Sequence, residues 1–245
     1  MMIEIKDLWK QFGKNIVLQG VNLLIPPGET IVIIGKSGCG KSVLLKLIIG
    51  LMKPDKGEVL FKGKDIFKMK RKELYALRNN FGFLFQGAAL FDSMSVEENV
   101  GLALKENTKM TDAEIKQVVE EKLELVGLPG IQNMSPSDLS GGMKKRVSLA
   151  RSLATNPSYI LYDEPTTGLD PVMSDAIDEL IKELAEKLNV TSIIVTHDIF
   201  SVYSVADKVA MMVDGKIYFH GTPHELIQSE DPIIRNFLHR TDKRL

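Results

Sequence analysis

The chain has 245 residues, 44% of them hydrophobic, and its 31 lysines and arginines nearly balance its 32 aspartates and glutamates. A chain of this length buries one sizeable core, so we expect a single domain over residues 1–245. The formal net charge of -1 excludes a surface that binds nucleic acid or an anionic membrane as a whole. The one cysteine, Cys39, excludes an internal disulfide framework and favours a reducing compartment.

Membrane-spanning segments are not expected, because every apolar run is far shorter than the roughly 20 residues that cross a bilayer. The first ten residues include Glu4, Lys6, Asp7 and Lys10, and therefore lack the apolar stretch of a secretory signal. We expect a cytosolic protein that acts at a membrane only through a partner.

Short β-type runs alternate with helical patterns through most of the chain, which predicts an α/β fold with a largely parallel sheet. The dipeptide Asp214-Gly215 predicts a hairpin between the last two strands. The predicted strands cover residues 3–8, 17–25, 30–34, 58–61, 81–85, 158–162, 191–196, 208–213 and 216–219.

The stretch at approximately residues 87–154 is mostly helical in pattern, and we interpret it as a helical subdomain inserted in the sheet domain. Within it, Thr111 and Glu114 predict a capping box, and apolar residues then recur at helical spacing. Near the C-terminus, Thr222-Pro223-His224-Glu225 predicts another helix start, with threonine as the cap and proline in the first turn.

A phosphate-binding loop is predicted by Gly35-Lys36-Ser37-Gly38-Cys39-Gly40-Lys41-Ser42, which matches GxxxxGK[ST] after a strand and opens the predicted helix 41–50. Its glycines let backbone N–H groups close around phosphates, and the helix N-terminus adds positive potential. Lys41 is predicted to reach the outer phosphates and Ser42 to bind Mg²⁺. The alternative is a glycine-rich turn without a ligand. We interpret Cys39 as a tolerated small side chain, with a redox role as the alternative.

The apolar strand Tyr159-Ile160-Leu161-Tyr162 ends in two carboxylates, Asp163 and Glu164, at the carboxyl edge of the predicted sheet. Asp163 is the predicted Mg²⁺ ligand, and Glu164 is the predicted general base for attack of water on the γ-phosphate. Two solvated acids at a strand end are the alternative, which the phosphate loop in the same chain disfavours.

The segment Leu139-Ser140-Gly141-Gly142-Met143 resembles the LSGGQ signature of ABC ATPases, and the resemblance covers nearly the whole chain. It implies a P-loop NTPase core of the ABC type, with an antiparallel β subdomain and the inserted helical subdomain. ATP and Mg²⁺ are the implied cofactors. The resemblance also implies a homodimer, because in ABC proteins the signature of one subunit closes over the nucleotide held by the other.

The same resemblance assigns roles to single residues. Gln86 is the Q-loop residue, His197 is the switch histidine that senses the γ-phosphate, and Phe12 stacks on adenine, with Trp9 or Val17 as alternatives. The implied catalytic residues are Glu164, His197, Gln86 and Lys41, and the implied Mg²⁺ ligands are Ser42, Gln86 and Asp163. The implied ATP contacts are Phe12, Gly35, Lys36, Ser37, Gly38, Cys39, Gly40, Lys41, Ser42 and Val43, and across the dimer Ser140, Gly141, Gly142 and Asp170.

The signature departs from its commonest form at Met143, where a glutamine normally stands, so the hydrogen bonds of that amide are missing. The basic residues Lys144-Lys145-Arg146 come directly after it. We interpret them as a solvated face, with a nucleotide-sensing patch as the alternative.

Residues 85–96 are apolar enough to form the docking surface for a membrane permease, and a helix that packs internally is the alternative. With Met143 and the segment 231–238, they resemble the ATPase of Mla/Mce-type lipid transporters. This implies phospholipid or lipid transport between bacterial membranes, at the cytoplasmic side of the inner membrane. The implied partners are a second copy, an integral membrane permease, a Mce-type substrate-binding protein and a small regulatory subunit, without nucleic acid. The alternatives are an importer ATPase for a small solute and a soluble ABC protein.

Overall fold

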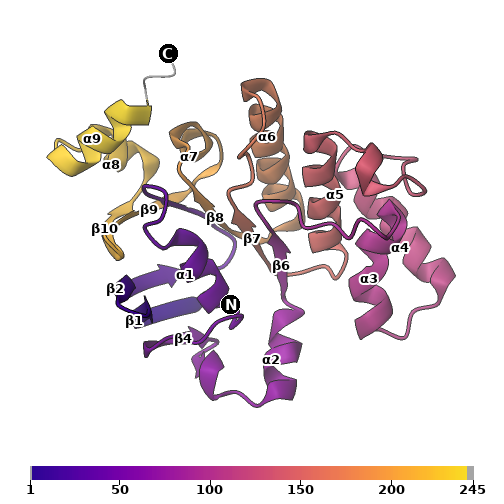
Figure 1. Cartoon of the computed structure of the whole chain (residues 1–245), viewed down its shortest axis with the longest axis horizontal. Helices are drawn as coiled ribbons and strands as arrows, with labels where there is room; N and C mark the ends of the chain where they lie inside the picture. The colour runs from indigo at the N-terminus through magenta and orange to yellow at the C-terminus, as the bar shows by residue number, and fades with distance from the viewer. Residues whose placement is uncertain (1, 242–245) are drawn as a thin grey trace. The chain divides into compact units, whose positions relative to one another are not determined.

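The computed structural model describes residues 2–241, which form two compact units (Figure 1). The first unit contains the chain up to Arg78 and again from Thr191 onward, and the second contains Asn79–Val190. None of the helices within residues 2–241 combines the length and the apolar character needed to cross a bilayer.

An antiparallel sheet in the first unit has the strand order β2-β1-β4-β5. Its buried face carries alternating apolar residues, such as Ile3 and Ile5 of β1, as expected when one face of a sheet packs on a core. β1 and β2 run further than predicted and meet at a tight hairpin, and the two-residue β5 had no pattern to predict it. The bounds are β1 Ile3–Phe12, β2 Asn15–Ile25, β4 Lys56–Phe61 and β5 Lys64–Asp65.

The other sheet of the first unit is built around β3 (Thr30–Ile34), which pairs in parallel with β8 (Thr191–Thr196) and β9 (Lys208–Val213). All residues of β3 and β8 are buried, as is typical of parallel strands covered on both faces. β10 (Lys216–Gly221) returns antiparallel beside β9, which confirms the hairpin predicted at Asp214-Gly215.

Helices complete the first unit. α1 packs against β8 and α7 against β3. The predicted helix start at Thr222 is confirmed, because its side chain accepts a hydrogen bond from the N–H of Glu225 in a capping box. The helices are α1 Lys41–Ile48, η1 Ile66–Lys68, α2 Arg71–Arg78, α7 Ile199–Val205, α8 Pro223–Gln228 and α9 Pro232–Thr241.

The second unit contains β6 (Phe81–Leu84) and β7 (Tyr159–Asp163), which pair in parallel, and several helices (Figure 1). The stretch predicted to be helical, residues 87–154, contains four helical segments and no strand. The capping box predicted at Thr111 is present at the start of α4. The helices are α3 Val96–Asn107, α4 Asp112–Leu125, η2 Pro136–Asp138, α5 Gly141–Leu153 and α6 Pro171–Leu188.

Candidate active site

The predicted phosphate loop connects β3 to α1, and two of its glycines are required by the surrounding backbone. A Cβ atom on Gly35 would lie 2.6 Å from the carbonyl oxygen of Met212 and 2.7 Å from the sulfur of Cys39. Gly40 has a φ of 105°, and a Cβ there would lie 3.0 Å from the carbonyl oxygen of Val17. Any other residue would clash or be strained at these two positions. Glycine is therefore required for the loop to pass this close to the neighbouring backbone.

Lys41 is buried inside this loop, with only 5% of its surface exposed. Its ammonium nitrogen donates to the carbonyl oxygens of Gly35, at 2.9 Å, and Lys36, at 3.3 Å. The positive charge is thus held inside the loop, next to the N-terminus of α1, where backbone N–H groups favour a bound anion.

His197 follows β8 at the same edge of the sheet as the phosphate loop. Ile34 and Thr196 are register partners in the β3–β8 pair, so Gly35 and His197 are the residues that come directly after them. The side chain of His197 is exposed, and Asp198 caps α7 by accepting from the N–H of Phe200 at 3.0 Å. The sheet register therefore brings the predicted γ-phosphate sensor to the mouth of the loop.

The aromatic residues proposed to stack on adenine differ in their surroundings. Phe12, at the end of β1, is 47% exposed, and the ammonium of Lys10 lies 5.5 Å from its ring centre. Trp9 is engaged elsewhere, because its indole N–H donates to Asp7 at 2.7 Å and its ring lies over Gly20. Phe12 is therefore the more accessible of the two rings, and its hairpin strand β2 passes the phosphate loop at Val17.

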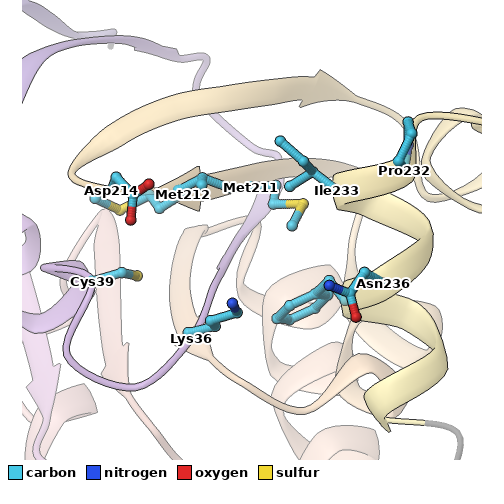
Figure 2. Close-up of a pocket in the computed structure, with 10 residues that line it drawn as sticks. Lys36, Cys39, Met211, Met212, Asp214, Pro232, Ile233 and Asn236 are labelled. Carbon is cyan, nitrogen blue, oxygen red and sulfur yellow. The ribbon is translucent and has the colours of Figure 1, made fainter.

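A cavity of about 420 Å³ lies beside the phosphate loop in the first unit. Figure 2 shows Lys36 and Cys39 pointing toward it from the loop, with Ile233 and Asn236 of α9 on another wall. The C-terminal helix thus borders the loop. The cavity is also lined by Met211, Met212, Val213, Asp214, Pro232 and Phe237.

Three predicted site residues of the second unit lie just beyond its parallel strand pair. Leu84 and Tyr162 are register partners, and Gln86 and Glu164 each lie two residues further on, with Asp163 in between on β7. Asp163 and Glu164 are buried, with 6% and 9% of their surfaces exposed, whereas Gln86 is exposed. The register therefore brings these oxygen-bearing side chains to one edge of the unit.

Glu164 has an unusual backbone conformation, with a φ of 50°. This left-handed geometry is unfavourable for a residue with a Cβ and is often retained where function needs it. The hydroxyl of Thr167 donates to the carboxylate of Glu164 at 3.2 Å, which orients one of its oxygens.

Lys145 does not belong to a solvated face, so that interpretation is wrong for this residue. It lies on α5 with 5% of its surface exposed, and its ammonium donates to the carbonyl oxygen of Gln86 and lies 3.5 Å from that of Glu164. Burial lowers the pKa of Lys145, and the carboxylates of Asp163 and Glu164 oppose this shift. The helical period, which groups Lys145 with the buried Leu149, was the available sequence signal.

The other two residues of the basic run differ from Lys145. Arg146 is partly buried, and its guanidinium donates to the carbonyl oxygen of Val126 at 2.9 Å. Lys144 is partly exposed at the surface of its unit. The run is thus a helix segment whose three basic side chains lie in different surroundings.

The signature residues form the N-terminus of α5. Ser140 is the N-cap and accepts from the N–H of Met143 at 3.3 Å. Ser140 and Gly141 are exposed, whereas Gly142 is buried against the side chain of Met173. Asp170 is likewise exposed and caps α6 through the N–H of Met173, at 3.0 Å. Ser140, Gly141 and Asp170 therefore lie at the surface of the second unit.

The segment predicted to dock a permease is held rigidly by the helices of its own unit. Asn99 is fully buried and bonds the main chain of Phe91 through both its oxygen, at 2.8 Å, and its nitrogen, at 3.0 Å. The side chain of Phe91 is 50% exposed. The loop therefore presents an apolar side chain on a fixed backbone.

A family model described as "ABC transporter" matches residues 18–167. The chain is 44% identical over 97% of its length to the intermembrane phospholipid transport system ATP-binding protein MlaF of Haemophilus influenzae, 90% of which is covered. It is 43% identical over 96% of its length to the probable ribonucleotide transport ATP-binding protein mkl of Mycobacterium leprae, 68% of which is covered.

Solved structures show the same similarity. A dimeric ATP-binding cassette in a post-hydrolysis state, bound to ADP and Pi, superposes with a TM-score of 0.82 at 34% identity, covering 90% of this chain and 98% of that one. The protein cbiO1 from Clostridium perfringens, part of an ABC transporter complex, superposes with a TM-score of 0.84 at 34% identity, covering 98% and 96%.

Proposed function

Because this chain belongs to the ABC transporter family and is one of its ATPases, we propose that it powers phospholipid transport between two membranes. The observation that carries the proposal is the 44% identity to MlaF of Haemophilus influenzae, over 97% of this chain and 90% of that one. Likeness over nearly the full length of both proteins includes the helices α3 and α4, which lie outside the catalytic motifs.

In this proposal, the first unit binds the nucleotide. The phosphate loop and Lys41 hold the phosphates, because the buried ammonium and the N–H groups of α1 supply positive potential at one point. Phe12 offers its exposed ring to adenine, and His197 donates to the γ-phosphate from the end of β8. ADP, which has no γ-phosphate, cannot make this contact with His197.

Mg²⁺ fits the donor types that the motifs supply. The Asp163 carboxylate, the Gln86 amide oxygen and the Ser42 hydroxyl are hard oxygen ligands of the kind that Mg²⁺ prefers. When bound, the ion neutralises charge that develops on the phosphates. The register of β6 and β7, which brings Gln86 and Asp163 to one edge, supports these two assignments.

Glu164 is the proposed general base. Its carboxylate accepts a proton from the water that attacks the γ-phosphorus, and ADP leaves with its β-phosphate oxygen. The hydrogen bond from Thr167, at 3.2 Å, holds one carboxylate oxygen in place. The left-handed backbone at Glu164 sets the direction in which this side chain leaves β7.

A second copy of the chain completes the nucleotide site. Ser140, Gly141 and Asp170 are exposed, so they are available to a nucleotide held by a partner. The dimeric cassette bound to ADP and Pi supports this arrangement. ATP would then favour the closed pair, and hydrolysis would remove that preference.

A membrane permease is the proposed partner at residues 85–96. The exposed ring of Phe91, on a backbone fixed by Asn99, gives an apolar contact for a cytoplasmic helix of the permease. The protein would then lie peripherally at the cytoplasmic side of the inner membrane. A Mce-type substrate-binding protein and a small regulatory subunit are further proposed members of the complex.

Transport of a small solute is the second candidate function. It is favoured by the mycobacterial relatives, whose name refers to ribonucleotide transport and which are 43% identical to this chain. Both candidates use the same ATPase, so they differ only in what the permease carries.

The two candidates are separated by reconstitution. The complex is purified from detergent-solubilised membranes, placed in vesicles, and assayed for ATP-dependent transfer of fluorescent phospholipid to acceptor vesicles. Phospholipid transfer that is lost with Glu164→Gln supports the proposal. Uptake of ribonucleotides without any lipid transfer would instead support the second candidate.

A further inference from the structure

One face of α5 carries three polar side chains that bond to the main chain of the segment after Phe85. Lys145, Ser148 and Arg151 are spaced three residues apart and therefore lie along the same side of the helix. Lys145 donates to the carbonyl of Gln86, and the Ser148 hydroxyl donates to that of Ala88 at 2.8 Å. We name this row of three side chains the α5 clamp.

The backbone that the α5 clamp holds is strained. Ala88 and Ala89 have φ values of 61° and 50°, a left-handed geometry that is costly for residues other than glycine. The guanidinium of Arg151 donates to both carbonyl oxygens, at 2.9 Å for Ala88 and 2.7 Å for Ala89. Such a turn persists only when its surroundings over-determine it, and here the surroundings are α5.

Lys145 differs from the other two members because it also reaches the end of β7. Its ammonium lies between the carbonyl of Gln86 and that of Glu164, which is 3.5 Å away at the long limit of a hydrogen bond. Glu164, like the two alanines, has a left-handed φ, at 50°. One buried cation thus contacts the main chain of Gln86 and of Glu164, two of the residues to which the proposed function gives chemical roles.

We propose that Lys145 is a positioning residue for ATP hydrolysis, holding the main chains of Gln86 and Glu164 together so that their side chains keep one mutual placement. The proposal rests on the proposed function, which makes Gln86 a Mg²⁺ ligand and Glu164 the base. Lys145 acts through these residues and has no contact with substrate in the proposal. Because it stands on the signature helix, a shift of α5 on dimer closure would be transmitted to both of them.

Packing alone does not explain why a lysine is buried at position 145. Desolvating an ammonium is unfavourable, and an apolar side chain of similar length would fill the same space without that cost. The carboxylates of Asp163 and Glu164 favour the charged ammonium, and its hydrogen-bond acceptors are two carbonyl oxygens from segments 59 and 19 residues away in the chain. The bonds therefore connect segments, which is what a positioning residue requires.

The test is Lys145→Met in the full-length protein, with its permease, in a steady-state ATPase assay. Methionine keeps the length and apolar volume of lysine but donates no hydrogen bond. We expect kcat to fall about tenfold or more, as loss of charge-assisted hydrogen bonds predicts, while KM for ATP changes by less than about twofold. Lys144→Met is the matched control, because it removes a neighbouring, partly exposed lysine from the same helix.

Rescue by Lys145→Arg distinguishes positioning from packing. A guanidinium can donate to both carbonyls and keep two charged bonds, so this variant is expected to recover at least about a third of the wild-type kcat. Hydrogen–deuterium exchange at residues 86–89 and 164–167 is expected to rise in Lys145→Met and to stay low in Lys145→Arg. A wild-type kcat in Lys145→Met, or unchanged exchange in both segments, overturns the inference.

If Lys145→Met does not fold, as judged by circular dichroism, Lys145→Leu replaces it. Leucine donates no hydrogen bond, so a reduced kcat with an unchanged KM supports the inference, and a wild-type kcat overturns it. Glu164→Gln is measured in the same series. Normal turnover in Glu164→Gln would refute the base assignment itself, whereas an inactive Glu164→Gln beside a fully active Lys145→Met would refute only the role of Lys145.

Discussion

In the first unit, the phosphate loop is held by groups close to it in sequence, whereas in the second unit Gln86 and Glu164 are held by a lysine far from both. Lys41 bonds carbonyls six and five residues before it. Lys145 bonds carbonyls 59 and 19 residues away. The phosphate loop is therefore held by hydrogen bonds between residues close in the chain, and the proposed base by a hydrogen bond between distant residues.

Two buried lysines with the same chemistry therefore have different consequences. Removing Lys41 affects one loop and the nucleotide proposed to bind there. Removing Lys145 affects the relative placement of two strand ends. The first change is expected to appear in ATP binding and the second in ATP turnover, and variants of each unit test this difference.

The largest effect is expected for Glu164→Gln, which removes the proposed base in the second unit and leaves the phosphate loop intact. We expect kcat for ATP hydrolysis to fall by roughly 10² to 10⁴, the range found for general-base removal. ATP affinity, measured by isothermal titration calorimetry, is expected to stay within about twofold, because amide and carboxylate have nearly the same size. Normal turnover in this variant would remove Glu164 from the role of base.

Lys41→Ala instead removes the buried ammonium from the phosphate loop of the first unit. Loss of one charged donor to the phosphates is expected to weaken ATP binding by about 10- to 100-fold and to lower turnover with it. Titration calorimetry of the nucleotide-free protein measures this, with Lys46→Ala on the same helix as the control. If Lys41→Ala bound ATP as tightly as Lys46→Ala, Lys41 would not contact the phosphates.

Ser140→Arg tests the exposed signature by itself. A long charged side chain at this N-cap is expected to reduce ATP-driven dimerisation at least about tenfold, by obstructing closure, while the nucleotide affinity of the monomer is unchanged. Analytical ultracentrifugation with ATP, in the Glu164→Gln background, measures the dimer.

The control is Ser140→Asn, which keeps a small side chain able to cap α5. It is expected to dimerise almost normally. Normal dimerisation of Ser140→Arg itself would contradict a shared site.

The smallest effect is expected on the free energy of unfolding, when two glycines of the phosphate loop are each replaced by alanine. Gly38 has a φ of 81°, and a Cβ atom added to it would have open space within 4 Å, whereas one added to Gly40 would meet Val17 and Leu18 at 2.8 to 3.0 Å. Gly38→Ala is expected to lower the free energy of unfolding by about 1 kcal/mol through backbone strain. Gly40→Ala is expected to cost about 1 kcal/mol more through overpacking. Urea unfolding without nucleotide measures both, and equal losses would show that the approach of β2 does not constrain the loop.

The fold class predicted from the sequence is confirmed by the family match and by the solved cassettes at TM-scores of 0.82 and 0.84. The hairpin at Asp214-Gly215 and the capping boxes at Thr111 and Thr222 are present, because each depends on residues within one turn. The roles assigned to the site residues stay predictions. The interpretation of Lys145 as solvated was wrong because charge alone does not tell a buried helical face from an exposed one.

Residues near each other in the chain determined the phosphate-loop motif and the two hydrogen bonds of Lys41, which all fall within eight residues. The close approach of Met212 to Gly35 and of Val17 to Gly40 belongs to the tertiary structure. Tertiary structure alone decided that His197 emerges beside Gly35, which needs the register of β3 and β8. It also decided that Lys145 reaches Gln86 and Glu164. The physical reason is that strand register and helix packing bring together main-chain groups whose distance along the chain leaves no local pattern.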